Sequence, residues 1–405
     1  MSFNEQAALK EHVRREVISA ADELVALSHE IHANPELAFE EVRACRSTST
    51  LLERFGYEID AGLCSLATAF RARSGGGSLR VALCSEYDAL PRIGHACGHN
   101  VIAAAAVGAA TGLRNVGEQL DLSVEVLGTP AEEDGGGKIF LLERGAFEGV
   151  HAALMVHPAP FDIAEPTVLG VDWIEARYIG KASHASAAPE EGIDAADAAV
   201  LAHTAIGLLR HHLDRSSRVH GVIRRAGDAP NIVPDLSELT YMVRATSSEQ
   251  LAAVRERAEQ CFEAGAIATG CRLEFSPRRR AYAPMRHDPR LTSRYRSNAE
   301  ALGRSFYDSR PEGQRWAAST DMGNVSQYLP AAQPLIGLGC APATNHQPEF
   351  AVACASAAAD RAVIDGAIAM AWTVLDIAHD DQFRAALTEE ALPASATSGI
   401  SRAER

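Results

Sequence analysis

The sequence predicts an α/β fold in which a mostly parallel sheet carries helices on both faces and a second, α+β domain is inserted into the first. Two observations predict the main domain. Short β-rich runs alternate with helical segments, and chemically active side chains directly follow several of those runs. A third observation, a change of pattern after Asp172, predicts the inserted domain.

The first part of the chain reads as a helix followed by alternating strands and helices. Apolar residues recur at helical spacing from about Glu5 to Ala33, where Asn34-Pro35 ends the pattern, so one long amphipathic helix is expected. Helices are also predicted at Val101 to Leu113 and Gly137 to Arg144. The predicted strands are Ala67 to Arg71, Arg80 to Ser85, Ser123 to Leu127 and Ala153 to Val156.

The inserted domain is predicted to have a βαββα order. Its boundaries are expected near Gly170 and Pro284, so that residues 1–170 and 284–392 form one discontinuous domain around residues 171–283. The small, polar residues of the tail 393–405 have nothing to bury, and disorder is expected there. The elements of the insertion are strand Trp173 to Ile179, helix Ala195 to His212, strands Val219 to Arg225 and Glu238 to Arg244, and helix Ser248 to Ala266.

Composition excludes several classes of function. With 38 basic against 53 acidic residues, the formal charge of -15 opposes binding to nucleic acid and to anionic lipid. The stretch Ala351 to Ala378 is apolar but is interrupted by Asp360, Arg361 and Asp365, so a packed helix is expected rather than a membrane span. The N-terminus is charged and lacks the apolar core of a signal peptide. The eight cysteines are scattered along the chain and are expected to be reduced thiols rather than disulfides, so a cytoplasmic protein is expected.

Five side chains that divalent metal ions accept as ligands lie near predicted strand ends and turns. Thiolate, imidazole and carboxylate groups are ligands of zinc, manganese and cobalt. In a parallel sheet the carboxyl ends of the strands lie at one edge, where ligands collect. We therefore expect five side chains to form one metal site: Cys97, His99, one of the adjacent pair Glu132 and Glu133, His157 and His346.

Glu132 and Glu133 are adjacent in the run GTPAEEDGGGK. Paired glutamates are common on solvated surfaces. This pair, however, follows the apolar run VEVLGTP and precedes three glycines, which suit a close approach of the backbone. A carboxylate beside a metal ligand can accept and donate a proton. One glutamate is therefore expected to hold metal and the other to move a proton.

Five longer motifs follow one another along the chain: EYDALPRIGHACGHN, GTPAEEDGGGK, GKASHAS, NIVPD and STDMGNVS. As a set they resemble the dinuclear metallopeptidases of the aminoacylase, glutamate carboxypeptidase and IAA-amino acid hydrolase family. They look most like the branch that contains aminobenzoyl-glutamate hydrolase and the peptidase-D-like β-alanyl dipeptidases. The resemblance implies a catalytic domain divided by a lid domain that also forms a homodimer.

The resemblance also implies roles for individual residues. It implies two divalent ions, zinc, manganese or cobalt, with Glu132 as the general base. The ions would be held by Cys97, His99, Glu133, His157 and His346. Asp88 takes the place of an aspartate that orients a ligand. His184 matches a lid histidine that steadies the oxyanion, often in the partner subunit's site. Asn231 and Arg244 match residues that hold the carboxylate of the substrate.

The implied activity is hydrolysis of the amide bond of N-acyl amino acids or dipeptide-like substrates with a free carboxylate. The chain departs from the family pattern at Glu86, where many members have a histidine ligand, and at Asn100, where close relatives often have aspartate. The motifs do not determine the acyl group. Two alternatives stay open: a non-catalytic binding protein of the same fold, and a metal-independent hydrolase that uses Cys97 with His99.

Overall fold

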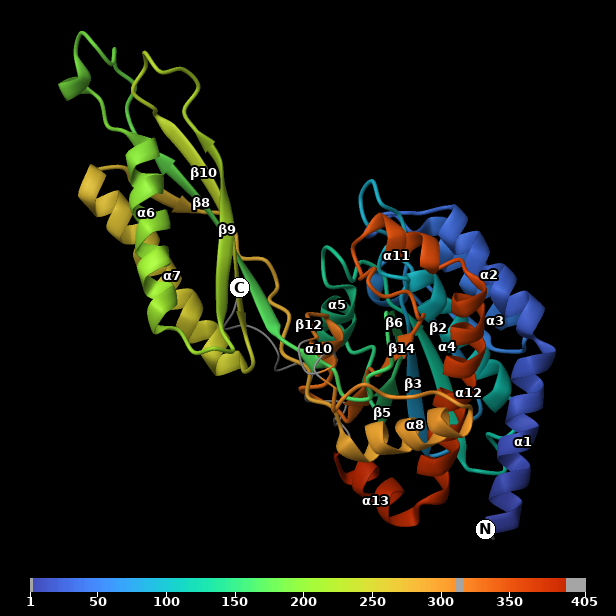
Figure 1. Cartoon of the computed structure of the whole chain (residues 1–405). Coiled ribbons are helices and arrows are strands. Elements are labelled where there is room, and N and C mark those ends of the chain that lie inside the picture. The colour runs from blue at the N-terminus through green and yellow to red at the C-terminus, as the bar shows by residue number, and fades with distance from the viewer. Residues whose placement is uncertain (1–2, 311–312, 314–315, 391–405) are drawn as a thin grey trace. The chain divides into compact units, whose positions relative to one another are not determined.

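The computed structural model describes residues 3–310, 313 and 316–390, so the tail 393–405 lies outside the described residues. The chain divides into two compact units (Figure 1). Unit 1 comprises Met1–Thr167 and Arg286–Arg405, and unit 2 comprises Val168–Met285. Unit 2 therefore interrupts unit 1 in the sequence.

Unit 1 contains a six-stranded sheet in the order β1-β2-β4-β3-β5-β13. The four strands from β4 to β13 are parallel to one another, and β1 and β2 add an antiparallel edge. Strand β13 follows unit 2 in the sequence, so both segments of unit 1 build this sheet. The strands are β1 (Glu58–Ala61), β2 (Phe70–Ser74), β3 (Leu79–Ser85), β4 (Leu122–Gly128), β5 (Ala152–Leu154) and β13 (Ala331–Ala332).

Helices pack against this sheet, and α4 is the most deeply buried of them (Figure 1). Every residue of α4 is buried, which explains its Ala-rich sequence, and it packs on α12, where a side chain at Gly108 would meet Ala367. The helices of unit 1 are α1 (Phe3–Ser19), α2 (Ala21–Ala33), α3 (Val42–Arg54), η1 (Leu63–Ser65), α4 (His99–Leu113), α5 (Gly137–Glu143), α8 (Pro289–Ala301), α10 (Met322–Val325), α11 (Pro348–Ala353), α12 (Ala357–His379) and α13 (Asp381–Glu390).

Short strands complete unit 1. β6 (His157–Ala159) pairs in parallel with β14 (Leu335–Gly337), which continues the parallel arrangement beyond β5 and β13. The remaining short strands are β7 (Thr167–Val168) and β12 (Ala317–Ala318).

Unit 2 is a four-stranded antiparallel sheet in the order β11-β8-β10-β9, with α6 and α7 packed on one face. Tyr178 and Phe262 lie in the core between them. Asp194 and Ser247 cap the two helices by accepting backbone N–H groups of the first turn. The elements are β8 (Gly170–Ile179), η2 (Pro189–Glu191), α6 (Ala195–Leu209), η3 (Arg210–His212), β9 (Arg218–Ala226), β10 (Leu236–Ala245), α7 (Ser248–Thr269) and β11 (Arg272–Phe275).

Four sequence predictions of elements need correction. The single helix expected from Glu5 to Ala33 is two helices, separated at Ala20. The strand expected at Ala67 to Arg71 begins three residues later, at Phe70. The apolar stretch before Ala378 is also two helices, because Ser356 caps the start of α12. Strand β11 was not predicted, since its four residues lack a clear alternation of apolar and polar side chains.

Among the described helices, α12 alone is long and apolar enough to cross a membrane. In its most apolar window, 78% of the residues are buried inside the protein. Such burial is what a core helix requires, and the three charged residues noted in the sequence lie on or next to its less buried face: Asp360, Arg361 and Asp365.

Candidate metal centre

The candidate site is assembled at the carboxyl ends of adjacent parallel strands in unit 1. Asp88 follows β3, the pair Glu132 and Glu133 follows β4, and His157 follows β5. His99 is the first residue of α4, and Gly98 before it has a left-handed backbone (φ 79°). A side chain at that glycine would lie 2.4 Å from Pro158, so only glycine fits the turn.

The structure brings all five predicted ligands together. Potential ligand atoms of Cys97, His99 and His157 lie within 4.8 Å of one another, and the sulfur of Cys97 is 3.5 Å from Nε2 of His157. A second group combines Cys97 with Glu133 and His346, whose Nε2 is 3.4 Å from Oε1 of the glutamate. Because Cys97 belongs to both groups, the two groups form one continuous cluster.

A third group of possible ligands contains a residue that was only noted as a departure from the family pattern. Glu86 lies within ligand distance of His99 and Glu132, and all three are buried. Oε2 of Glu86 is 3.5 Å from Nε2 of His99. Glu86 therefore faces the same centre as the five predicted ligands.

The buried polar atoms of this cluster fit a bound cation. Among the described residues, Oε2 of Glu86, Nε2 of His99 and Oε1 of Glu133 are buried without a hydrogen-bond partner. Leaving such atoms unsatisfied costs about 1–3 kcal/mol each, and more if they are charged. Two carboxylate oxygens and an imidazole nitrogen that converge in this way are a donor set for a divalent metal.

Asp88 orients the ligand that lies deepest in the cluster. Its Oδ1 is 2.9 Å from Nδ1 of His99, and its Oδ2 accepts a hydrogen bond of 2.9 Å from the backbone N–H of Glu133. A carboxylate at Nδ1 places the proton there and leaves Nε2 as the lone pair that faces the cluster. The predicted orienting position of Asp88 is thus present in the geometry.

The two adjacent glutamates differ in electrostatic environment. Burial raises the pKa of Glu132 well above its ordinary value, and the charges of Glu86 and Glu133 add to the effect. Burial also raises the pKa of Glu133, but the adjacent imidazole of His346 and the charge of His99 outweigh it and leave a lowered pKa. The two side chains therefore differ: Glu132 holds a proton readily, whereas Glu133 stays ionised.

A buried lysine supports the cluster from one side. Nζ of Lys138 lies 2.5 Å from Oε1 of Glu86 and 2.7 Å from Oδ1 of Asp321, and all three side chains are fully buried. Burial lowers the pKa of Lys138, but the carboxylates of Asp321 and Glu86 outweigh it and hold that pKa above its ordinary value. Lys138 thus stays charged and fixes the orientation of Glu86. The sequence patterns did not predict this role, although the motifs containing Lys138 and Asp321 were both recognised.

Asn100, the second departure from the family pattern, does not belong to these groups of possible ligands. Its side-chain amide donates 2.9 Å hydrogen bonds to Oγ of Ser28 and to the backbone carbonyl of Cys354. The side chain therefore ties α4 to the helices that flank it.

The three predicted lid residues all lie in unit 2. His184 pairs with Ile232 in an isolated β-bridge, and the backbone carbonyl of Asn231 accepts a 3.1 Å hydrogen bond from Ala185, so the His184 and Asn231 segments are adjacent. Arg244 is the ninth of the ten residues of β10, and Asn231 precedes the first residue of that strand.

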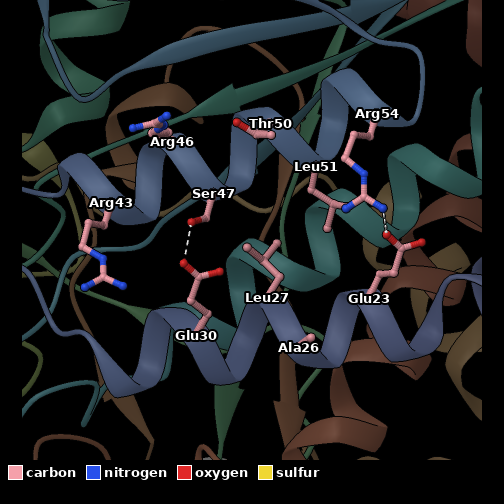
Figure 2. A pocket seen from close by; sticks show the side chains of 10 residues that line it. All are labelled: Glu23, Ala26, Leu27, Glu30, Arg43, Arg46, Ser47, Thr50, Leu51 and Arg54. Atoms are coloured by element: carbon pink, nitrogen blue, oxygen red, sulfur yellow. Dashed lines mark hydrogen bonds and ion pairs between the residues drawn. The ribbon is translucent and has the colours of Figure 1, made fainter.

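A separate surface pocket lies between α2 and α3 (Figure 2). Arg54 forms an ion pair with Glu23 across it, and Ser47 donates a 2.8 Å hydrogen bond to Glu30. None of the predicted site residues lines this pocket. Its polar groups are largely engaged with one another across the two helices, so it is not the candidate site.

Comparisons with known proteins identify a family. A family model described as peptidase family M20/M25/M40 matches residues 82–364. The Xaa-Arg dipeptidase of Mus musculus is 41% identical over 395 residues, which cover 93% of this chain and 90% of that protein. The Xaa-Arg dipeptidase of Homo sapiens is 37% identical over 390 residues, which cover 92% of this chain and 89% of that protein.

Solved structures share the fold. A dinuclear metal-binding peptidase of family M20 from Bacillus subtilis aligns with a TM-score of 0.67 at 23% identity, covering 88% of this chain and 99% of that one. An aminobenzoyl-glutamate utilization protein from Klebsiella pneumoniae aligns with a TM-score of 0.66 at 20% identity, covering 87% and 98%. The predicted α/β fold with a mostly parallel sheet is confirmed.

Proposed function

The chain belongs to peptidase family M20/M25/M40, and on this basis we propose that it is a metal-dependent amidohydrolase of N-acyl amino acids or dipeptide-like substrates with a free carboxylate. One observation carries the proposal. Buried ligand atoms of Glu86, His99 and Glu133, without hydrogen-bond partners among the described residues, converge beside Glu132, a carboxyl group with a raised pKa.

The donor set suits two divalent ions, and zinc, manganese and cobalt all accept these ligands. We assign the ligands as Cys97, His99, Glu133, His157 and His346, with Glu86 facing the same centre. When bound, such ions polarise the scissile carbonyl and lower the pKa of water from about 15.7 towards about 7.

In this proposal Glu132 transfers the proton from water to the leaving amine. Its carboxylate accepts a proton from the attacking water, and the same carboxyl group then donates that proton to the nitrogen of the leaving amine. Asp88 keeps the lone pair of His99 directed at the centre throughout.

The lid residues take the remaining roles. We assign His184 to the oxyanion and Asn231 to the free carboxylate of the substrate, because both carry suitable donors on adjacent segments of unit 2. Arg244, near the end of β10, is assigned to the same carboxylate, because its guanidinium offers paired donors that suit such a group. Dipeptides that end in arginine are the first substrates to test, given the Xaa-Arg dipeptidases among the relatives.

We also propose a homodimer formed through unit 2. Among the described strands, β9 is an edge of its sheet and so presents backbone groups that a second strand could pair with. Val222 on this strand is 56% exposed, and Leu208 at the end of α6 is 63% exposed. A second copy of the chain would cover these apolar side chains. Sedimentation equilibrium distinguishes a dimer from a monomer.

The decisive experiment uses protein stripped with a chelator and resupplied with zinc, manganese or cobalt. Amine release is measured from N-acyl amino acids, from dipeptides that end in arginine, and from the same dipeptides with an amidated C-terminus. Activity that disappears on stripping and returns with one ion supports the proposal. Equal cleavage of amidated and free-acid substrates would contradict the carboxylate requirement.

The same experiment separates the two alternatives. Activity that survives the chelator would indicate a hydrolase with Cys97 as nucleophile, but burial raises the pKa of that thiol well above its ordinary value, which disfavours a free thiolate. No activity with any ion would favour a binding protein. We further place the protein in the cytoplasm, because all eight cysteines are free thiols.

A further inference from the structure

Glu41 is a buried carboxyl group with no role in the mechanism above. It is 0% exposed and precedes α3, yet its side chain does not cap that helix. Its Oε1 instead accepts two backbone hydrogen bonds, one of 2.9 Å from Phe39 and one of 2.8 Å from Ala131. The second bond joins segments 90 residues apart in the sequence, and it ends directly before Glu132.

Both donors have an unusual backbone. Phe39 has φ 62° and Ala131 has φ 59°, in the left-handed region that is unfavourable for a residue with a side chain. Such conformations persist only where neighbouring contacts enforce them. A single buried oxygen that accepts both N–H groups is such a contact, and it holds the two strained residues in one arrangement.

The strained residue Ala131 begins the loop that carries the catalytic pair. The backbone N–H of Gly136 donates a 2.8 Å hydrogen bond to the carbonyl of Ala131, which closes the loop. On the other side of Glu132, the N–H of Glu133 is held by Asp88 at 2.9 Å. The general base is therefore flanked by two backbone groups that are each fixed by a buried carboxyl group.

The side chain of Phe39 packs on the same loop. A side chain at Gly135 would lie 2.4 Å from the Phe39 ring, so the ring rests directly against the loop backbone. The ring also meets Phe140 edge-on, with centroids 5.8 Å apart. The segment before α3 thus supports the loop through both its backbone and a side chain.

We propose that Glu41 is a positioning residue for Glu132 and Glu133: it fixes the left-handed backbone of Ala131, and through it the direction of the general base and of one metal ligand. The inference rests on the proposed function for the roles of the two glutamates. It extends the site to a segment that contains none of the proposed metal ligands or substrate-binding residues.

The test compares Glu41→Ala with Glu41→Gln, which keeps a carbonyl oxygen in place of Oε1. Glu36→Ala is the matched control, because the Glu36 carboxylate accepts the N–H groups of Arg43 and Ala44 in the same region and does not contact the loop. We expect Glu41→Ala to lower kcat at least about tenfold with KM within about twofold, because a small misplacement of catalytic groups is costly. Glu41→Gln should recover most of kcat, and Glu36→Ala should keep it.

Two measurements do not depend on turnover. In Glu41→Ala, the amide of Ala131 should exchange with solvent faster, and the stripped protein should bind zinc at least about tenfold more weakly in competition with a chromophoric chelator. Unchanged exchange and zinc affinity would overturn the inference, even if the wild-type protein proved inactive and the proposed function failed. Equal kcat losses in Glu36→Ala and Glu41→Ala would also overturn it. If Glu41→Ala does not fold, Glu41→Asp, which withdraws the acceptor, is measured in its place, with the same expected losses.

Discussion

Nδ1 of His99 lies 2.9 Å from Oδ1 of Asp88, and both side chains are almost completely buried. This contact determines which nitrogen of the imidazole faces the metal centre. The opposite nitrogen, Nε2, points at Glu86, Glu132 and Glu133 at distances of 3.5, 3.7 and 3.8 Å. The carboxylate of Asp88 thus fixes the proton on Nδ1 and leaves Nε2 facing the other carboxylates, which is the arrangement that a histidine ligand requires.

The first prediction concerns that contact. Asp88→Asn can donate an amide N–H to Nδ1, which would place the imidazole proton on Nε2, facing the centre. We expect about a 10- to 100-fold loss of metal affinity or activity, the usual effect of removing such a partner. Zinc titration of the stripped protein measures it, with the exposed Asp60→Asn as the control. An affinity equal to that of the control would show that Asp88 does not set the tautomer.

The second prediction separates proton transfer from metal binding. Glu132→Gln keeps the shape of the side chain but removes the proton acceptor, so kcat should fall by about 10²- to 10⁴-fold while the bound metal is retained. His346→Ala removes a proposed ligand and should lose both activity and metal. Metal content by atomic emission and amine release are measured on the same samples. Near-normal turnover of Glu132→Gln would exclude it as the base.

Local patterns in the sequence predicted much of the fold and the centre of the site. The apolar runs before Glu132 and His157 predicted two strands that end just before these residues. Five ordered motifs identified the family, which is confirmed. The supporting contacts could not be predicted in this way. Lys138 meets Asp321 across 183 residues, and Glu41 meets Ala131 across 90, so neither pair leaves a periodic signal in the sequence.

The third prediction concerns Lys138 and its buried ion pairs. Lys138→Met would leave the carboxylates of Glu86 and Asp321 buried without their cation. Removing one member of a buried ionic cluster typically costs about 3–5 kcal/mol of the free energy of unfolding. Urea denaturation measures it, and Lys181→Met, at an exposed lysine, should change stability by less than about 0.5 kcal/mol. A similar small change in both variants would show that the cluster does not need the lysine.

The fourth prediction is a pH dependence of stability centred on Glu41. Burial, with a smaller contribution from the charge of Asp88, raises the pKa of Glu41 from 4.5 to about 7. The folded state therefore binds this proton more tightly than the unfolded state. The resulting stability is fully present below about pH 4.5 and is lost as the pH rises through 7. Between pH 5 and pH 8 the loss should reach about 2–3 kcal/mol of the free energy of unfolding.

Glu41→Gln isolates this contribution, because glutamine keeps the acceptor oxygen for Ala131 and does not ionise. Urea denaturation of both proteins at pH 5, 6, 7 and 8 gives the difference in free energy of unfolding, in which the titration of all other groups largely cancels. That difference should move in favour of the glutamine variant as the pH rises, with its midpoint between the two pKa values. A difference that stays constant over this range would mean that Glu41 titrates alike in the folded and unfolded protein, and that its burial is fully offset by the hydrogen bonds it accepts.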